Sequence, residues 1–158
     1  MMAQFPAERD KLPPAALTAP DGSALDLAQY AGRKLVLFFY PKDDTPGCTT
    51  ENIDFSALAG DFAKADTALL GISKDPPARH LKFAAKHSLT APLASDAADG
   101  GLSDALGIWR EKQNYGRTYI GMVRSTYLID ADGRIARVWS PVKVKGHAAE
   151  VLAAAQVL

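Results

Sequence analysis

The chain has a single cysteine, no excess of charge of either sign and no long hydrophobic run. One cysteine cannot form a disulfide within the chain, which excludes a disulfide-stabilised scaffold and a Cys-x-x-Cys dithiol reductase. The 18 basic and 18 acidic residues cancel, so the charge predicts no binding to nucleic acid or to an anionic membrane. No apolar run approaches the roughly 18 residues that a membrane span needs, and the N-terminus lacks a secretion signal. We therefore expect a cytoplasmic protein.

The length of 158 residues suits one domain that can bury a core without disulfides or structural metal. A hydrophobic share of 47% is typical of a soluble globular protein. No internal repeat, low-complexity tract or interior linker interrupts the chain, so we expect a single domain over residues 1–158. The first dozen residues, which end at Pro13 and Pro14, are expected to be loose.

Apolar runs separated by turn residues predict alternating strands and helices. The Asp21-Gly22 pair predicts an N-terminal β-hairpin over residues 16–27, and the apolar run 34–40 predicts a strand buried on both faces. The other expected elements are a helix from just before Cys48 to Phe62, a strand over 67–72, a helix over 76–87, a short strand over 93–95, a short helix over 102–106, a polar loop, strands over 123–129 and 134–139, and a helix over 147–157. This order predicts an α/β fold of the thioredoxin type, with a mixed central sheet flanked by helices.

The sequence before Cys48 predicts a chemically unusual setting for this residue. Thr45, Pro46 and Gly47 supply an N-cap hydroxyl, a proline suited to the first helical position and a flexible glycine, so Cys48 is expected in the first turn of a helix. Unpaired backbone N–H groups and the positive end of the helix dipole then favour the nucleophilic thiolate. A lone cysteine is otherwise most often a small buried hydrophobic residue.

Two acids in the same loop work against a thiolate. Asp43 and Asp44 would oppose the negative charge if they faced the sulfur. A cation from elsewhere in the chain is therefore expected at the site, and the residues near Cys48 do not identify it.

The sequence offers no pattern for a metal or an organic cofactor. His80, His87 and His147 are the only histidines, and with one cysteine they give no recognisable zinc spacing. We expect them at the surface or at helix ends. The Thr-Pro-Gly-Cys stretch is neither a Walker A loop nor a dinucleotide-binding fingerprint, so no nucleotide cofactor is expected.

The string YPKDDTPGCTTE contains the pattern P-x-x-x-T-x-x-C, formed by Pro41, Thr45 and Cys48. This string resembles the active site of peroxiredoxins, and in particular of the bacterioferritin comigratory protein or PrxQ subfamily. The stretches GIWREKQNYGRTYIGMVRSTYLID and KVKGHAAEV share the resemblance, which extends from Leu12 through nearly the whole chain. It implies a monomeric thiol peroxidase that reduces hydrogen peroxide and organic hydroperoxides without a cofactor.

The resemblance also implies the roles of individual residues. Cys48 is the cysteine that attacks the peroxide, Thr45 supplies a hydroxyl that holds the sulfur and the peroxide oxygen together, and Pro41 shields the site. Arg124, in the stretch Arg-Ser-Thr, is the missing cation. A fixed guanidinium suits this chemistry because negative charge develops on the leaving oxygen.

Simpler roles are open for some of these residues. Thr45 could serve only as an N-cap, although one hydroxyl can cap the helix and still face the sulfur. Arg124 could merely pair with Glu51, which lies one helical turn beyond Cys48; the best functional role for Glu51 is to orient that arginine. Gly47 is expected as a supporting residue of the same loop.

The chain departs from many members of the subfamily in its lack of a resolving cysteine. Such a cysteine stands five residues after the first, where this chain has Ile53, or in the following helix, where it has Ala84 and Ala85. The sulfenic acid formed on Cys48 must then be reduced by an external thiol. Thioredoxin, glutaredoxin with glutathione, or a second copy linked through Cys48 are the partners that we consider.

Two other functions compete with the peroxidase. The same scaffold could serve a peroxide-sensing or redox-interaction protein, because a fold does not fix a function. The joint presence of Pro41, Thr45, Cys48 and Arg124 favours the enzyme. A thiol transferase is less consistent with the sequence because it needs a second cysteine.

Overall fold

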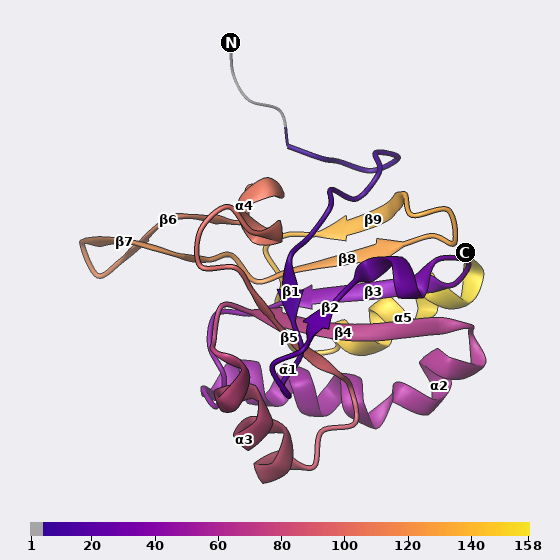
Figure 1. Cartoon of the computed structure of the whole chain (residues 1–158), viewed down its shortest axis with the longest axis horizontal. Helices are drawn as coiled ribbons and strands as arrows, with labels where there is room; N and C mark the ends of the chain where they lie inside the picture. Colours follow the sequence, from indigo (N-terminus) through magenta and orange to yellow (C-terminus); the bar gives the residue numbers. More distant parts are fainter. Residues whose placement is uncertain (1–4) are drawn as a thin grey trace.

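The structure is a computed structural model that describes residues 5–158 (Figure 1). Its elements are β1 (Leu17–Thr18), β2 (Ala24–Leu25), a 3-10 helix η1 (Leu27–Tyr30), β3 (Lys34–Phe39), α1 (Pro46–Ala57), α2 (Ala59–Lys64), β4 (Thr67–Ser73), α3 (Pro77–His87), β5 (Leu93–Asp96), α4 (Leu102–Ala105), β6 (Trp109–Asn114), β7 (Arg117–Met122), β8 (Ser125–Ile129), β9 (Ile135–Trp139) and α5 (His147–Val157). None of the helices in the described part of the chain is both long and apolar enough to cross a membrane.

Seven strands form one mixed sheet in the order β2-β1-β5-β4-β3-β8-β9. The central strands β3, β4 and β5 are parallel, whereas β8 pairs antiparallel with β3 and β9 pairs antiparallel with β8. The N-terminal hairpin of β1 and β2 joins the sheet through β5. The predicted α/β fold with a mixed central sheet flanked by helices is confirmed.

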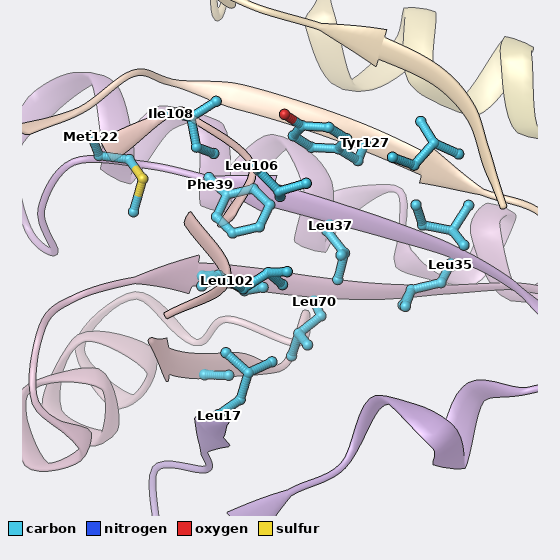
Figure 2. Packing of buried hydrophobic residues seen from close by; sticks show 14 of the residues in the cluster. Leu17, Leu35, Leu37, Phe39, Leu70, Leu102, Leu106, Ile108, Met122 and Tyr127 are labelled. Atoms are coloured by element: carbon cyan, nitrogen blue, oxygen red, sulfur yellow. The ribbon is translucent and has the colours of Figure 1, made fainter. Parts of the chain in front are cut away.

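The core lies in two layers on opposite faces of β3, as expected for a strand whose residues are apolar without alternation. One layer joins Val36 and Phe38 to apolar side chains of α1, α2, α3 and α5, and it includes Cys48. The other layer joins Leu35, Leu37 and Phe39 to α4, β1 and the strands near the C-terminus, as Figure 2 shows. The cysteine is therefore held between the sheet and the helices.

The stretch that was predicted to be a polar loop after residue 106 instead contains a second hairpin, β6–β7, which projects from the body (Figure 1). Its two-residue turn places Tyr115 and Gly116 at φ values of 51° and 76°, as a tight hairpin turn requires. Most of β7 is exposed, so this strand has no face to bury against the core. Its sequence therefore lacks the alternation of apolar and polar residues that identifies a half-buried strand.

The segment before β1 was expected to be loose, yet part of it is bonded to the edge of the sheet. The amide of Arg9 donates to Ile135 O at 2.7 Å, and the amide of Leu12 donates to Gly133 O at 3.0 Å. Lys11 forms a β-bridge with Arg134. These bonds cover the free edge at β9. Residues 1–4, which belong to the same expectation, lie outside the described residues.

Candidate active site

The loop between β3 and α1 delivers Cys48 to the start of a helix, as predicted. Pro46 is the first residue of α1, and Cys48 is the third. Its side chain is buried, with 1% of the residue exposed. In this position the sulfur lies beside the first turn, where backbone N–H groups have no partner within the helix.

Thr45 occupies the N-cap position but does not cap the helix with its hydroxyl. Its backbone is extended, as at most N-caps, yet its Oγ1 donates to the carbonyl oxygen of Lys42 at 2.8 Å. The predicted N-cap bond is therefore wrong. The hydroxyl instead closes the loop that precedes the cysteine, and the N–H groups of the first helical turn receive no acceptor from it.

Arg124 reaches the sulfur from the segment between β7 and β8. Its Nη2 donates to Cys48 Sγ at 3.3 Å, and its Nη1 donates to Glu51 Oε1 at 2.6 Å. The arginine thus bridges the cysteine and the acid one helical turn further on. The structure brings together the three residues that the sequence suggested, and the guanidinium is positioned to favour the thiolate.

The ion pair of Glu51 and Arg124 is largely buried, with 1% and 17% of the side chains exposed. Burial raises the pKa of Glu51 to about 7; Arg124 acts in the opposite direction, and Asp54 adds to the rise. Burial alone would lower the pKa of Arg124, but Glu51 and the cysteine sulfur outweigh it, so the pKa of Arg124 is raised. The guanidinium therefore stays charged next to the sulfur.

Gly47 is the residue against which Arg124 packs. A Cβ atom at this position would lie 3.2 Å from Arg124 Nη2. The glycine thus allows the guanidinium to reach the sulfur over the helix backbone. Pro41 stands at the beginning of the same loop and is half-buried; its expected role as a shield stays a prediction.

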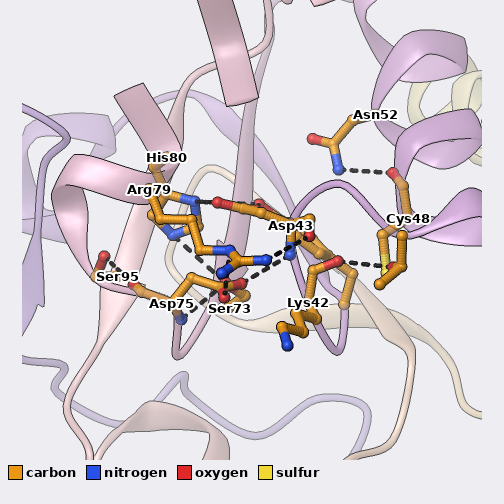
Figure 3. A network of polar contacts seen from close by, with 11 residues as sticks. Lys42, Asp43, Cys48, Asn52, Ser73, Asp75, Arg79, His80 and Ser95 are labelled. Carbon is orange, nitrogen blue, oxygen red and sulfur yellow. Dashed lines mark hydrogen bonds and ion pairs between the residues drawn. The ribbon is translucent and has the colours of Figure 1, made fainter. Parts of the chain in front are cut away.

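Asp43 and Asp44 do not face the sulfur. The carboxylate of Asp43 turns toward His80, at 2.7 Å (Figure 3). The carboxylate of Asp44 lies 2.7 Å from Lys86 Nζ. The two carboxylates that could have opposed a thiolate are therefore directed toward side chains of α3.

The expectation that the histidines lie at the surface or at helix ends is wrong in part. His80 has no exposed surface, and His147, although it begins α5, is buried against Thr126 with an Nε2–Oγ1 distance of 2.8 Å. His87 does lie at the end of α3. Within residues 5–158 no group of three or more histidine, cysteine and acidic side chains could hold a metal ion.

Asn52 is a contact of the site that the sequence did not suggest. Its Nδ2 donates to the carbonyl oxygen of Cys48 at 2.9 Å, and the side chain is fully buried. The available signal was its position four residues after the cysteine, on the same helix face. This contact ties the first turn of α1 to the second.

Three comparisons relate the chain to known proteins. Residues 9–138 match the model of the AhpC/TSA family. Peroxiredoxin Bcp of Bacillus subtilis is 44% identical over 142 residues, which make up 90% of each protein. A structure of Xanthomonas campestris bacterioferritin comigratory protein, whose description concerns alkyl peroxide reduction, is 41% identical with a TM-score of 0.85 and covers 96% of this chain and 98% of that one. Xylella fastidiosa PrxQ is 37% identical with a TM-score of 0.88, covering 98% of both chains.

Proposed function

Because the chain belongs to the AhpC/TSA family and is a peroxiredoxin of the Bcp and PrxQ group, we propose that its thiol peroxidase chemistry takes place at Cys48. The observation that carries this proposal is the 3.3 Å contact between Cys48 Sγ and Arg124 Nη2 in a buried site at the start of a helix. Neither a structural cysteine nor a simple binding surface requires a buried guanidinium at the sulfur.

The reaction follows from the charges at the site. The Cys48 thiolate attacks one oxygen of the hydroperoxide, an S–O bond forms, and the O–O bond breaks with its electron pair on the leaving oxygen. That oxygen takes a proton and departs as water or an alcohol, while Cys48 becomes a sulfenic acid. Arg124 stabilises the thiolate before the attack and the developing oxyanion during it.

The other residues have supporting roles in this proposal. Glu51 holds Arg124 in place through the 2.6 Å contact, and Gly47 leaves room for the guanidinium. Thr45 keeps the loop closed through its bond to Lys42, and its remaining lone pairs are available to a peroxide O–H. Pro41 limits the access of water.

We propose hydrogen peroxide and organic hydroperoxides as substrates. The chemistry needs only an O–O bond, and the relative from Xanthomonas campestris is described in terms of alkyl peroxide reduction. The rates of Cys48 oxidation by hydrogen peroxide, by cumene hydroperoxide and by a fatty-acid hydroperoxide test this point. Equal second-order rates would mean that the site recognises only the peroxide group.

The second half of the cycle depends on an external thiol in this proposal, because Cys48 is the only cysteine. A thiolate attacks the sulfenic sulfur, hydroxide leaves as water, and a mixed disulfide forms; a second thiol then reduces it. Thioredoxin, or glutaredoxin with glutathione, supplies these thiols. The protein works as a monomer in the cytoplasm, where thiols are kept reduced, and a dimer linked through Cys48 forms when no reductant is present.

Turnover separates this function from that of a peroxide sensor. Peroxide consumption is measured with thioredoxin and its reductase, and separately with glutathione and glutaredoxin, for wild type and for Cys48→Ser. We expect steady consumption by wild type with at least one of the two systems and none by the variant. If Cys48 oxidises once and neither system restores it, the protein is a sensor and not a peroxidase.

A further inference from the structure

The loop that precedes Cys48 contacts α3 and the segment that joins β4 to α3 (Figure 3). Tyr40, at the start of this loop, donates its hydroxyl to Asp43 Oδ1 at 2.6 Å. The backbone amide of Asp43 donates to Asp75 Oδ2 at 2.8 Å. The same carboxylate oxygen accepts the hydroxyl of Ser73, the last residue of β4, at 2.6 Å. These contacts involve no atom of the peroxide site.

At the centre of this network lies a buried acid and base. The Nδ1 of His80 is 2.7 Å from Asp43 Oδ2, and neither side chain has any exposed surface. Among the described residues Asp43 Oδ2 has no well-aligned hydrogen-bond donor. The imidazole of His80 is the group that lies beside this buried oxygen. Burial of such a pair is costly, and neither residue contacts Cys48 in the hydrogen bonds of the site. The pair therefore needs a reason other than the chemical step.

A second pair joins the same two elements at the surface. Asp44 contacts Lys86 at 2.7 Å and His87 at 3.0 Å, and 38% of the Asp44 side chain is exposed. Exposed pairs contribute little because water and salt screen them. The surface pair is therefore a weak link between the loop and α3, and the buried contact of Asp43 with His80 is the second contact between the same elements.

Hydrogen bonds connect the loop that carries Asp43 to the first turn of α1. Asp43 lies between Lys42 and Thr45. The hydroxyl of Thr45 donates to the carbonyl oxygen of Lys42 at 2.8 Å and so closes the turn around Asp43. The amide of Thr49 in turn bonds to Thr45 O at 2.8 Å, which fixes the first turn of α1. A shift of Asp43 therefore moves the helix start on which Cys48 lies.

We propose that Asp43 and His80 are positioning residues for the peroxide reaction. They hold the loop against α3, so that the sulfur of Cys48 stays buried and aligned with Arg124. This inference rests on the proposed role of Cys48. Misplacement of reacting groups by about 1 Å can cost on the order of 100-fold in rate, so the pair affects catalysis without touching the substrate.

The test compares Asp43→Asn, His80→Gln and the double variant with wild type. Cys48 oxidation by hydrogen peroxide should be about 10- to 100-fold slower in both single variants, and the double variant should be no slower than the slower single one, since the two residues act as one unit. Alkylation by iodoacetamide at a pH of about 10, where a cysteine ionises without help from Arg124, measures access alone and should become faster. A purely structural role would not produce these opposite changes.

Two controls complete the test. Asp44→Asn removes the exposed pair from the same loop, and Ile135→Ala removes buried volume from the other core layer; both should oxidise at close to the wild-type rate. Oxidation of Asp43→Asn and His80→Gln at the wild-type rate would overturn the inference, as would the same slowing in an Ile135→Ala protein of equal unfolding midpoint. A wild type that does not react with peroxide would instead overturn the proposed function.

Hydrogen exchange tests the same point without substitution, in case the buried variants do not fold. The amide of Asp43 should exchange in reduced wild-type protein as slowly as those of β3, because its bond to Asp75 opens only when the loop moves away from the β4–α3 connection. Exchange as fast as that of the exposed turn at Tyr115 would show that the loop is not held.

Discussion

Arg124 contributes to the site through two contacts at once. One nitrogen of its guanidinium contacts Cys48 Sγ and the other contacts Glu51. The contact with Glu51 therefore fixes the position of the guanidinium at the sulfur. A planar guanidinium can do this, whereas the single ammonium of lysine cannot occupy both positions. The charge at the sulfur and its orientation are therefore properties of one side chain.

Replacement of this side chain should abolish most of the reactivity. Arg124→Ala should lower the rate of Cys48 oxidation by about 100-fold, as expected for the loss of one charge-stabilising donor. Arg124→Lys should recover part of this loss, because it keeps the charge but not both contacts. Stopped-flow fluorescence measures both rates, and a wild-type rate in Arg124→Ala would remove the residue from the mechanism.

Glu51 should give the stability a specific dependence on pH. Its pKa rises from 4.5 to about 7 on folding, so the folded state binds more protons between these values and its stability falls as the pH rises through them. Glu51→Gln removes this effect. Relative to wild type, the variant should gain up to about 3 kcal/mol in free energy of unfolding between pH 4 and pH 8, as measured by urea titration. A constant difference would show that folding leaves the pKa of Glu51 unchanged.

Sequence reasoning identified the residues at the sulfur but not the directions of several side chains. Cys48, Arg124 and Glu51 come together as the resemblance suggested. The hydroxyl of Thr45 turns back to Lys42, which no local rule predicts, since the N-cap bond is the usual alternative. His80 is buried beside Asp43, which lies 37 residues earlier in the sequence. A pairing of such separation depends on the tertiary fold.

At the scale of elements, Arg124 reaches the first turn of α1 from the segment between β7 and β8. Gly47 makes this possible because even one methyl group would lie 3.2 Å from the guanidinium. Helix propensity alone favours alanine over glycine inside a helix. The glycine at this position therefore serves the site at the expense of the helix.

Two glycine substitutions separate these effects. Gly47→Ala should slow peroxide oxidation because it displaces Arg124 from Cys48. Gly60→Ala in α2, where a Cβ would meet nothing within 4 Å, should raise the free energy of unfolding by roughly 0.5–1 kcal/mol and leave the rate unchanged. The comparison uses stopped-flow oxidation and urea unfolding of both variants. Equal rates in the two would mean that Arg124 tolerates the methyl group.

The elements themselves were largely predictable, with two exceptions: the β6–β7 hairpin, and the helix expected to run to Phe62, which the structure divides at Leu58 into α1 and α2. The buried strands β3 and β4 carry continuous apolar runs, and α3 carries an amphipathic pattern. The helix α5 extends over the predicted residues His147–Val157. The β6–β7 hairpin was missed because its strands are mostly exposed and rich in charged residues. Only its Tyr115-Gly116 turn carried a local signal, and one glycine in a polar stretch is equally typical of a loop.

For the whole molecule, two buried groups act on stability in opposite directions. Burial lowers the pKa of His147 from 6.5 to about 4; Glu150 acts against this change, and Arg124 adds to it. The folded state therefore binds fewer protons than the unfolded chain between these values, and stability falls as the pH drops through them. Glu51 has the opposite effect over nearly the same range, so the two largely cancel in wild type.

A variant of His147 should reveal the pH dependence of stability that Glu51 and His147 cancel in wild type. Relative to wild type, His147→Gln should gain up to about 3 kcal/mol in free energy of unfolding as the pH falls from 7 to 4, because it cannot acquire the buried charge. Urea titrations at several pH values measure it. If residues 1–158 form one domain, as we propose, each titration will show a single transition.

Reaction of the reduced protein with hydrogen peroxide in a stopped-flow instrument is the most direct test of the central claim, that Cys48 attacks the peroxide with the help of its buried setting. Intrinsic fluorescence follows the reaction, a sulfenic-acid trap and mass spectrometry identify the product, and Cys48→Ser is the control. We predict a second-order reaction far faster than that of a free thiol, with one oxygen added at Cys48 and no reaction in the variant. A rate equal to that of a free thiol would contradict the account.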